Sequence, residues 1–177
     1  NQIEEKIVDA LFQIKGGYAL VILTNNELIG VRDPFGIRPL VIGKLNKSYV
    51  LASETCGLDI VGANFVREVE NGEIVVINKN GIKSIKPFPQ KKTRPCIFEY
   101  IYFSRPDSIL ENKSVYEHRK NLGKELAKES SVKSDLIVPV PDSGVPAAIG
   151  YAEHLKKSIE FGIIRNHYVG RTFIEPS

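Results

Sequence analysis

A short polar group, Asp142-Ser143-Gly144, follows the apolar run Leu136–Val140 and precedes residues typical of a helix start. The pattern predicts a buried parallel strand, a tight loop and a helix with Pro146 in its first turn, where the missing proline N–H has no partner to lose. Free N–H groups at such a helix start bind anions, and the loop adds a carboxylate, a hydroxyl and a glycine that is predicted to let a ligand approach the backbone. We therefore predict binding of a phosphate or pyrophosphate with its metal ion. The alternative is an ordinary strand-to-helix turn.

A second polar group lies past the next apolar run, Ile159–Ile164, which is predicted as the following strand. Arg165, Tyr168 and Arg171 come soon after it. In a parallel sheet they lie at the same edge as the 142–144 loop, so the two arginines are placed to close over a phosphorylated substrate. The alternative is a solvated loop.

The elements that must position these residues have the length of one βαβ unit. Its helix is predicted to run from about Val145 to about Leu155. Upstream, Ser114 begins another helix, and Glu117 three residues later completes a capping box. The buried stripe of this helix is predicted to consist of Val115, Leu122 and Leu126.

The first half of the chain is predicted to be mostly antiparallel β-structure with one leading helix. Apolar residues at helical spacing mark that helix over Ile3–Phe12, and Gly16-Gly17 ends it. Strands joined largely as hairpins by polar turns are predicted at 18–23, 28–31, 40–42, 49–52, 66–69, 74–77 and 82–85. The predicted fold class is therefore α/β, with an α+β first part and a parallel βαβ unit in the second.

Residues 86–95 differ in composition from both flanking regions. They are rich in proline and in basic residues and show no hydrophobic periodicity. We interpret 88–95 as a connection between a first part, 1–87, and a second part, 96–177. The alternative is a long exposed hairpin loop.

The overall composition excludes several classes of protein. The chain has 177 residues, of which 42% are hydrophobic and 25% charged, as in ordinary globular proteins. A net charge of +3 is too small to indicate nucleic acid or an acidic membrane surface. No apolar run approaches the roughly 18 residues of a membrane span. Two cysteines without short spacing suggest a reducing compartment, and the absence of methionine suggests an internal fragment.

Neither cysteine lies in a motif that marks a catalytic nucleophile. Cys56 follows a predicted strand, and an isolated cysteine there is more typical of a small buried hydrophobe. Cys96 opens the second part, and a metal cluster at this position would need ligands from elsewhere. The histidines lack metal-ligand spacing, and the chain contains neither a dinucleotide-binding nor a P-loop motif.

Five sequence blocks together resemble a known enzyme family. They are Asp33-Pro-Phe-Gly-Ile-Arg-Pro-Leu40, Ala52-Ser-Glu-Thr-Cys56, Phe98-Glu-Tyr-Ile-Tyr-Phe-Ser-Arg-Pro-Asp-Ser108, Val140-Pro-Asp-Ser143 and Tyr168-Val-Gly-Arg-Thr-Phe-Ile174. In this order and spacing they are similar to the glutamine phosphoribosylpyrophosphate amidotransferases, also called amidophosphoribosyltransferases. The resemblance covers essentially the whole chain.

The resemblance implies an incomplete N-terminal-nucleophile glutaminase domain over 1–87 and an incomplete type I phosphoribosyltransferase domain over 96–177. Members of the family release ammonia from glutamine and add it to phosphoribosyl pyrophosphate. The product is 5-phosphoribosylamine, in the first committed step of de novo purine synthesis. The resemblance further implies purine nucleotides as feedback inhibitors, a homotetrameric full-length protein and a cytoplasmic location.

The resemblance also implies roles for particular residues. Asp142-Ser143-Gly144 matches the pyrophosphate loop of the family, and Ser143 matches a magnesium position, where a hydroxyl supplies the hard oxygen that Mg²⁺ prefers. The segment 165–174, with Arg165, Tyr168 and Arg171, matches the first part of a flexible loop that closes over the sugar phosphate. Cys96 matches an iron–sulfur ligand of those members that carry a [4Fe-4S] cluster; other members have a cysteine there without a cluster.

The chain departs from the family pattern at its first residue. The family's nucleophile is an N-terminal cysteine, whereas residue 1 is Asn1. The glutamine-binding residues of the family would precede Asn1, and the paired aspartates that hold the ribose and magnesium would follow Ser177. We therefore expect neither glutaminase nor transferase activity from these 177 residues alone. The alternative is a non-catalytic phosphate- or nucleotide-binding regulatory or scaffolding module.

Overall fold

The computed structural model describes residues 2–168 and residue 170. The chain divides into a first unit, Asn1–Glu99 with Ser108–Asn112, and a second unit, Tyr100–Asp107 with Lys113–Ser177. It therefore leaves the first unit after Glu99, returns for a short segment and leaves again. The predicted connection, 88–95, lies within the first unit. The assignment of the two parts to a glutaminase and a transferase domain stays a prediction.

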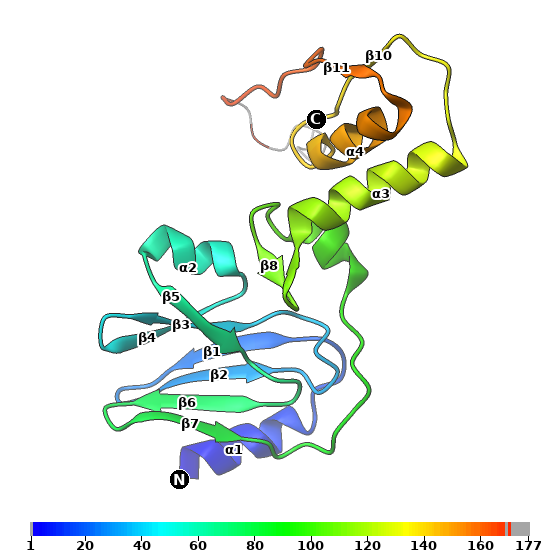
Figure 1. The fold of residues 1–177 in the computed structure, drawn as a ribbon. Coiled ribbons are helices and arrows are strands. Elements are labelled where there is room, and N and C mark those ends of the chain that lie inside the picture. Colours follow the sequence, from blue (N-terminus) through cyan, green and yellow to red (C-terminus); the bar gives the residue numbers. More distant parts are fainter. Residues whose placement is uncertain (1, 169, 171–177) are drawn as a thin grey trace, which may run out of the picture. The chain divides into compact units, whose positions relative to one another are not determined.

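Two antiparallel sheets and two helices form most of the first unit (Figure 1). One sheet has the strand order β1-β2-β6-β7 and the other the order β4-β3-β5. The elements are α1 (Gln2–Leu11), β1 (Ala19–Leu23), β2 (Leu28–Arg32), β3 (Val41–Leu45), β4 (Ser48–Ala52), α2 (Thr55–Val61), β5 (Asn64–Glu68), β6 (Ile74–Asn78), β7 (Gly81–Ile85) and β8 (Ile109–Leu110). The predicted leading helix and hairpins are confirmed. Helix α2 was not predicted, because seven residues interrupted by Gly57 show no clear helical period.

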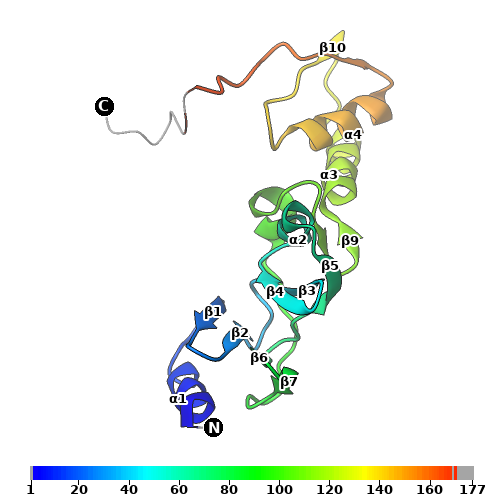
Figure 2. The same cartoon turned by 90° about the vertical axis from the view of Figure 1, so that its left-hand side faces the viewer.

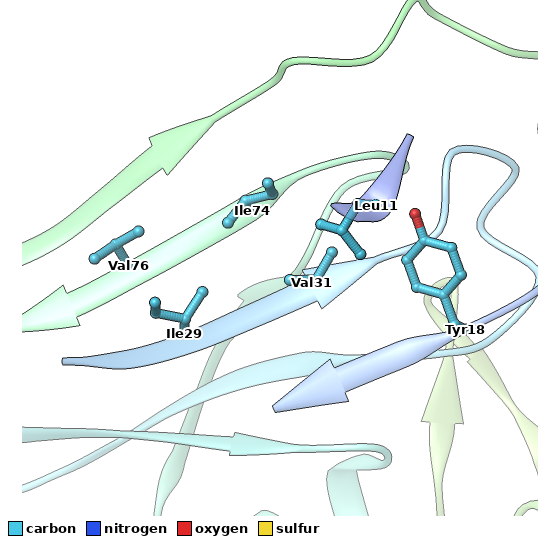
Figure 3. Close-up of a cluster of buried hydrophobic side chains, with 6 residues drawn as sticks. All are labelled: Leu11, Tyr18, Ile29, Val31, Ile74 and Val76. Atoms are coloured by element: carbon cyan, nitrogen blue, oxygen red, sulfur yellow. The ribbon is translucent and has the colours of Figure 1, made fainter. Parts of the chain in front are cut away.

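These elements stack in four layers, in the order α1, larger sheet, smaller sheet and α2 (Figures 1 and 2). Alternate residues of a strand point to opposite faces of its sheet, so one strand serves two clusters. In β6, Ile74 and Val76 face α1, whereas Val75 faces the smaller sheet. Figure 3 shows the cluster beneath α1, formed by Leu11, Tyr18, Ile29, Val31, Ile74 and Val76.

The two remaining clusters hold the smaller sheet in place. Leu40, Ile42 and Val69 pack with Val75 between the two sheets. On the other face of the smaller sheet, Val41 packs against Leu58 of α2 and Ala63. The first unit is thus organised around apolar layers on both faces of both sheets, which is the arrangement that buries short strands most completely.

The segment Ser108–Asn112 belongs to the first unit although residues on both sides of it belong to the second. The Ser108 hydroxyl donates to Glu54 Oε2 at 2.7 Å, and the Ile109 N–H donates to Thr55 Oγ1 at 2.9 Å. The Glu111 N–H donates to Glu68 Oε1 at 2.6 Å. These bonds attach the segment to the start of α2 and to the end of β5.

The second unit contains a parallel βαβ element, as predicted. Leu136 pairs with Ser158 and Ile137 with Ile159 in parallel register. The elements of this part of the chain are a π-helical turn (Glu99–Phe103) that begins at the last residue of the first unit, β9 (Lys113–Ser114), α3 (Val115–Glu129), β10 (Leu136–Ile137), α4 (Val145–Leu155) and β11 (Ser158–Ile159). Among the described residues, no helix has the length and apolar character that crossing a membrane requires.

The two parallel strands are much shorter than predicted. The prediction extended the first strand to Val140, but the ladder ends at Ile137. Pro139 and Pro141 have no N–H to donate, so they cannot continue a strand ladder. The prediction of burial on both faces is also wrong for the described residues, since Leu136 is 44% and Val140 67% exposed. The second strand, predicted over Ile159–Ile164, ends at Ile159.

Helix α3 starts as predicted and buries Val115 as predicted, but the rest of its buried stripe differs. The Ser114 hydroxyl accepts the Glu117 N–H at 3.3 Å, which confirms the capping interaction at the helix start. Leu122 and Leu126 were predicted to be buried, yet they are 41% and 52% exposed. The buried residues of α3 are Val115, Arg119, Gly123 and Ala127.

Close contact between the backbones of α3 and α4 explains this difference. A Cβ atom at Gly123 would overlap the carbonyl of Ala147, and one at Gly150 would overlap the carbonyl of Lys120. Helices that approach this closely need small residues at the crossing, so the larger leucines lie beside it. Arg119 is buried as well, because its guanidinium donates at 2.7 Å to the carbonyls of Tyr100 and Ser104 and so holds the π-helical turn.

Candidate functional site

The predicted anion-binding loop forms a tight turn between β10 and α4. The Gly144 N–H donates to the Val140 carbonyl at 3.2 Å, and the Val145 N–H donates to the Asp142 carbonyl at 3.3 Å. The peptide bond between Pro141 and Asp142 is cis. Asp142 is exposed and Ser143 is half-buried. The turn therefore presents a carboxylate and a hydroxyl at the start of a helix.

Gly144 has a role in the turn that the sequence did not reveal. It was predicted to let a ligand approach the backbone, but a Cβ at this position would lie 2.6 Å from the Val140 carbonyl oxygen. Its φ of −78° is one that any residue adopts, so the close approach, and not the backbone angle, favours glycine. Among the described residues, no side chain caps the N-terminus of α4. The Val145 N–H bonds to the Asp142 carbonyl and Pro146 has no N–H, so the helix start offers an anion few N–H donors.

Arg165 lies beside this turn. Its Nη1 is 2.9 Å from Asp142 Oδ2, although the two residues are 23 positions apart. Both side chains are more than half exposed. Tyr168 is 100% exposed, and its backbone N–H donates to Asn166 Oδ1 at 2.9 Å. Arg171 lies outside the described residues. The structure thus brings Arg165, but not Tyr168, into contact with the predicted loop.

The second predicted metal position, Cys96, is half-buried in the first unit. Its N–H donates to the Ile37 carbonyl at 3.1 Å, and its carbonyl accepts the Glu99 N–H at 3.1 Å. An iron–sulfur cluster needs several thiolates, but the chain has two cysteines and the other one, Cys56, is only 5% exposed and lies with its thiol 3.8 Å from Glu54. The residues of this chain do not fit a cluster on their own.

A magnesium ion suits the turn before α4 better than an iron–sulfur cluster suits Cys96, although the turn supplies only some of the ligands that magnesium needs. The described residues contain no group of three histidine, cysteine or acidic side chains arranged to hold a metal. Magnesium in phosphate sites takes only one or two protein oxygens and completes its shell with phosphate oxygens and water. The Ser143 hydroxyl supplies one such oxygen. This donor set suits a metal ion that arrives together with a phosphorylated ligand.

The first unit holds a second acidic turn, which sequence reasoning placed only as a loop. Asp33 is fully buried, and its carboxylate accepts the N–H groups of Phe35, Ile37 and Arg38 at 3.0 to 3.1 Å. It also accepts the Tyr18 N–H at 3.4 Å. An aspartate before Pro-x-Gly signals a turn, but the number of its bonds could be counted only in the structure.

Glu73 is the other fully buried acid of the first unit. Arg67 donates to both of its carboxylate oxygens, at 2.8 and 2.7 Å. Burial by itself would raise the pKa of Glu73, but the hydrogen bonds from Arg67, from Ser84 and from the Glu70 backbone outweigh it and leave this pKa lowered. The same hydrogen bond raises the pKa of Arg67. Both groups therefore stay charged and hold the turn between β5 and β6.

Comparisons with known proteins agree with this architecture. A family model described as a glutamine amidotransferase domain matches residues 1–59. The amidophosphoribosyltransferases of Rhizobium etli and Bacillus subtilis are 53% and 50% identical to this chain over 98% and 99% of it. A solved structure of the B. subtilis glutamine phosphoribosylpyrophosphate amidotransferase, complexed with ADP and GMP, aligns over 99% of the chain with a TM-score of 0.92.

The chain belongs to the amidophosphoribosyltransferase family. It spans 36% and 37% of the two curated relatives and 38% of the solved chain. The chloroplastic relative from Glycine max, 51% identical over 97% of this chain, is covered over 30% of its length. Both units of the chain lie within the aligned region. The predicted family and the mixed α/β fold with antiparallel sheets are thereby confirmed.

Proposed function

We propose that this chain is part of an amidophosphoribosyltransferase, which uses glutamine to convert phosphoribosyl pyrophosphate to 5-phosphoribosylamine in de novo purine synthesis. The observation that supports this most strongly is about 50% identity to curated amidophosphoribosyltransferases across 97% or more of the chain. The exposed acidic turn before α4, with Arg165 beside it, is compatible with a phosphorylated substrate.

In the proposed reaction, the residues of this chain bind and orient the pyrophosphate group. The Ser143 hydroxyl would hold magnesium, which when bound neutralises phosphate charge and orients the leaving group. Arg165, beside the turn, would offer the anion planar, charge-assisted N–H donors. Polar groups aimed at the leaving pyrophosphate stabilise it as negative charge develops.

We further propose that the chain alone has neither activity. Cys56 and Cys96 are its two cysteines, and neither is placed as an N-terminal nucleophile. Cys56 is buried beside Glu54, and Cys96 lies in mid-chain. Glutamine, phosphoribosyl pyrophosphate and purine nucleotides are the proposed ligands of the full-length enzyme. The complex of the B. subtilis relative with ADP and GMP supports the proposal that purine nucleotides are ligands.

A chimera tests the proposal directly. The matching third of the B. subtilis relative is replaced by this chain, and 5-phosphoribosylamine formation is measured. We expect measurable activity, because the two sequences are half identical over 99% of this chain. Ser143→Ala in the chimera should weaken magnesium-dependent binding of phosphoribosyl pyrophosphate, whereas the matched change Ser134→Ala, at a serine outside the turn, should not.

A folded chimera without activity would contradict the proposal. The alternative, a non-catalytic phosphate-binding module, makes a different prediction for the isolated chain. It requires magnesium-dependent binding of phosphoribosyl pyrophosphate by the 177 residues themselves, abolished by Ser143→Ala. Calorimetry on the isolated chain, with the B. subtilis relative as positive control, separates the two.

A further inference from the structure

The ion pair between Arg165 and Asp142 joins two segments that have few other bonds to each other. After the Glu160 N–H bonds to the Ile137 carbonyl at 3.0 Å, residues 161–168 follow without regular secondary structure. The backbone bonds described for this stretch are local, such as that from Gly162 to Glu160. Within the described residues, the Arg165 guanidinium is thus the side-chain attachment of this stretch to the turn.

Asp142 presents a problem for anion binding. A phosphate at the start of α4 would lie near its carboxylate, and like charges repel. The paired guanidinium removes this difficulty, because it balances the carboxylate. An arginine has five N–H donors in a planar fork, and a single bond to Asp142 Oδ2 leaves the others able to reach a phosphate.

From this geometry we propose that Asp142 is a positioning residue that holds Arg165 beside the turn before the pyrophosphate group arrives. The inference rests on the proposed function. In this proposal Asp142 binds neither the metal ion nor the phosphate. It holds the arginine that binds the phosphate. A donor that is already in place loses less conformational freedom on binding, so the pair raises affinity by preorganisation.

If Asp142 positions Arg165, the change Asp142→Asn should have opposite effects on pyrophosphate affinity in the presence and in the absence of Arg165. In the otherwise unchanged chimera, Asp142→Asn should weaken binding of inorganic pyrophosphate by about two- to fivefold, the range that breaking an exposed ion pair allows. In an Arg165→Gln background, the same change should strengthen binding, because it then only removes a repelling charge. Asp135→Asn, the same change at an exposed aspartate with no described contact to the turn, is the matched control.

Magnesium distinguishes this role from metal coordination. Calorimetry with inorganic pyrophosphate is carried out with and without Mg²⁺. Under the positioning role, Asp142→Asn weakens binding in both conditions, and Asp142→Glu, which keeps the carboxylate, restores most of the loss. Weakening that appears only with Mg²⁺ would make Asp142 a metal ligand and overturn the proposal, as would equal weakening in the Arg165→Gln background.

A measurement without ligand separates the inference from the proposed function. Trypsin cleaves after an arginine whose side chain is available, so the ion pair should slow cleavage of the Arg165–Asn166 bond. We expect Asp142→Asn to raise that rate by about two- to fivefold while cleavage after Lys157 is unchanged. Equal cleavage at Arg165 in both proteins would refute the positioning role. A folded chimera that forms no 5-phosphoribosylamine would instead refute the proposed function, and it would leave the result of this cleavage experiment unchanged.

Discussion

Asp33 and Asp142 occupy turns of similar composition but have opposite surroundings. Both turns combine an acid with proline and glycine. Asp33 is fully buried, and its two oxygens accept four backbone N–H groups. Asp142 is exposed, and within the part of the chain that the structure describes a single arginine contacts its carboxylate. The first aspartate is thus part of the fold, whereas the second has capacity left for a partner. The bonds of the carboxylate, and not the residue types, distinguish a structural turn from a candidate binding turn.

The largest expected effect comes from removing the buried acid. Asp33→Ala leaves four N–H groups without their acceptor, and we expect the free energy of unfolding to fall by about 3 kcal/mol. Urea unfolding followed by circular dichroism measures this change. A loss below about 0.5 kcal/mol would show that water replaces the carboxylate and that the turn does not depend on it.

An intermediate effect should appear as a pH dependence of stability. The pKa of Glu73 is lowered in the fold, so its charged form stabilises the protein above the unfolded value of about 4.3. This contribution is lost as the pH falls through the folded value, because the unfolded chain then binds the proton more readily. Between pH 7 and pH 3, the unchanged protein should lose more unfolding free energy than Glu73→Gln. Parallel curves for the two proteins would rule out Glu73 as a source of acid sensitivity.

The smallest expected effect belongs to the exposed turn. Asp142→Asn should change the free energy of unfolding by less than about 0.5 kcal/mol, since exposed ion pairs contribute little and salt screens them. The same urea titration provides the comparison with Asp33→Ala. A loss as large as that of Asp33→Ala would remove the distinction between the two turns and would make Asp142 a structural residue.

Local signals predicted the first unit well. Its strands are short runs rich in apolar residues and its turns contain Asn-Gly or other polar residues, so element type followed from short-range pattern alone. The start of α3 was equally predictable, because the Ser114 hydroxyl needs only a residue three positions away. Helix α2 was missed, because its burial depends on its packing against Val41, which lies in a different element.

Features that depend on contacts between elements were not predictable. Leu122 and Leu126 have the spacing of a buried stripe, but the glycine crossing of α3 and α4 places them beside the contact. The strand is shorter than the apolar run that ends at Val140, because Pro139 within the run and Pro141 after it cannot donate to a strand ladder. For the turn, pattern indicated Asp142, Ser143 and Gly144 but not which of them bonds to Arg165. That bond joins residues 23 positions apart, a separation that local pattern does not report.

The return of Ser108–Asn112 to the first unit has a practical consequence for dissection of the chain. A polypeptide ending at Glu99 would lack the partners that the Ser108 hydroxyl and the Ile109 and Glu111 N–H groups provide to Glu54, Thr55 and Glu68. A single proteolytic nick between residues 99 and 108 would likewise leave the second unit tethered to the first through the segment 108–112. The two units are therefore interleaved along the sequence and cannot be separated by one cut. A fragment meant to contain the whole first unit therefore has to run at least to Asn112.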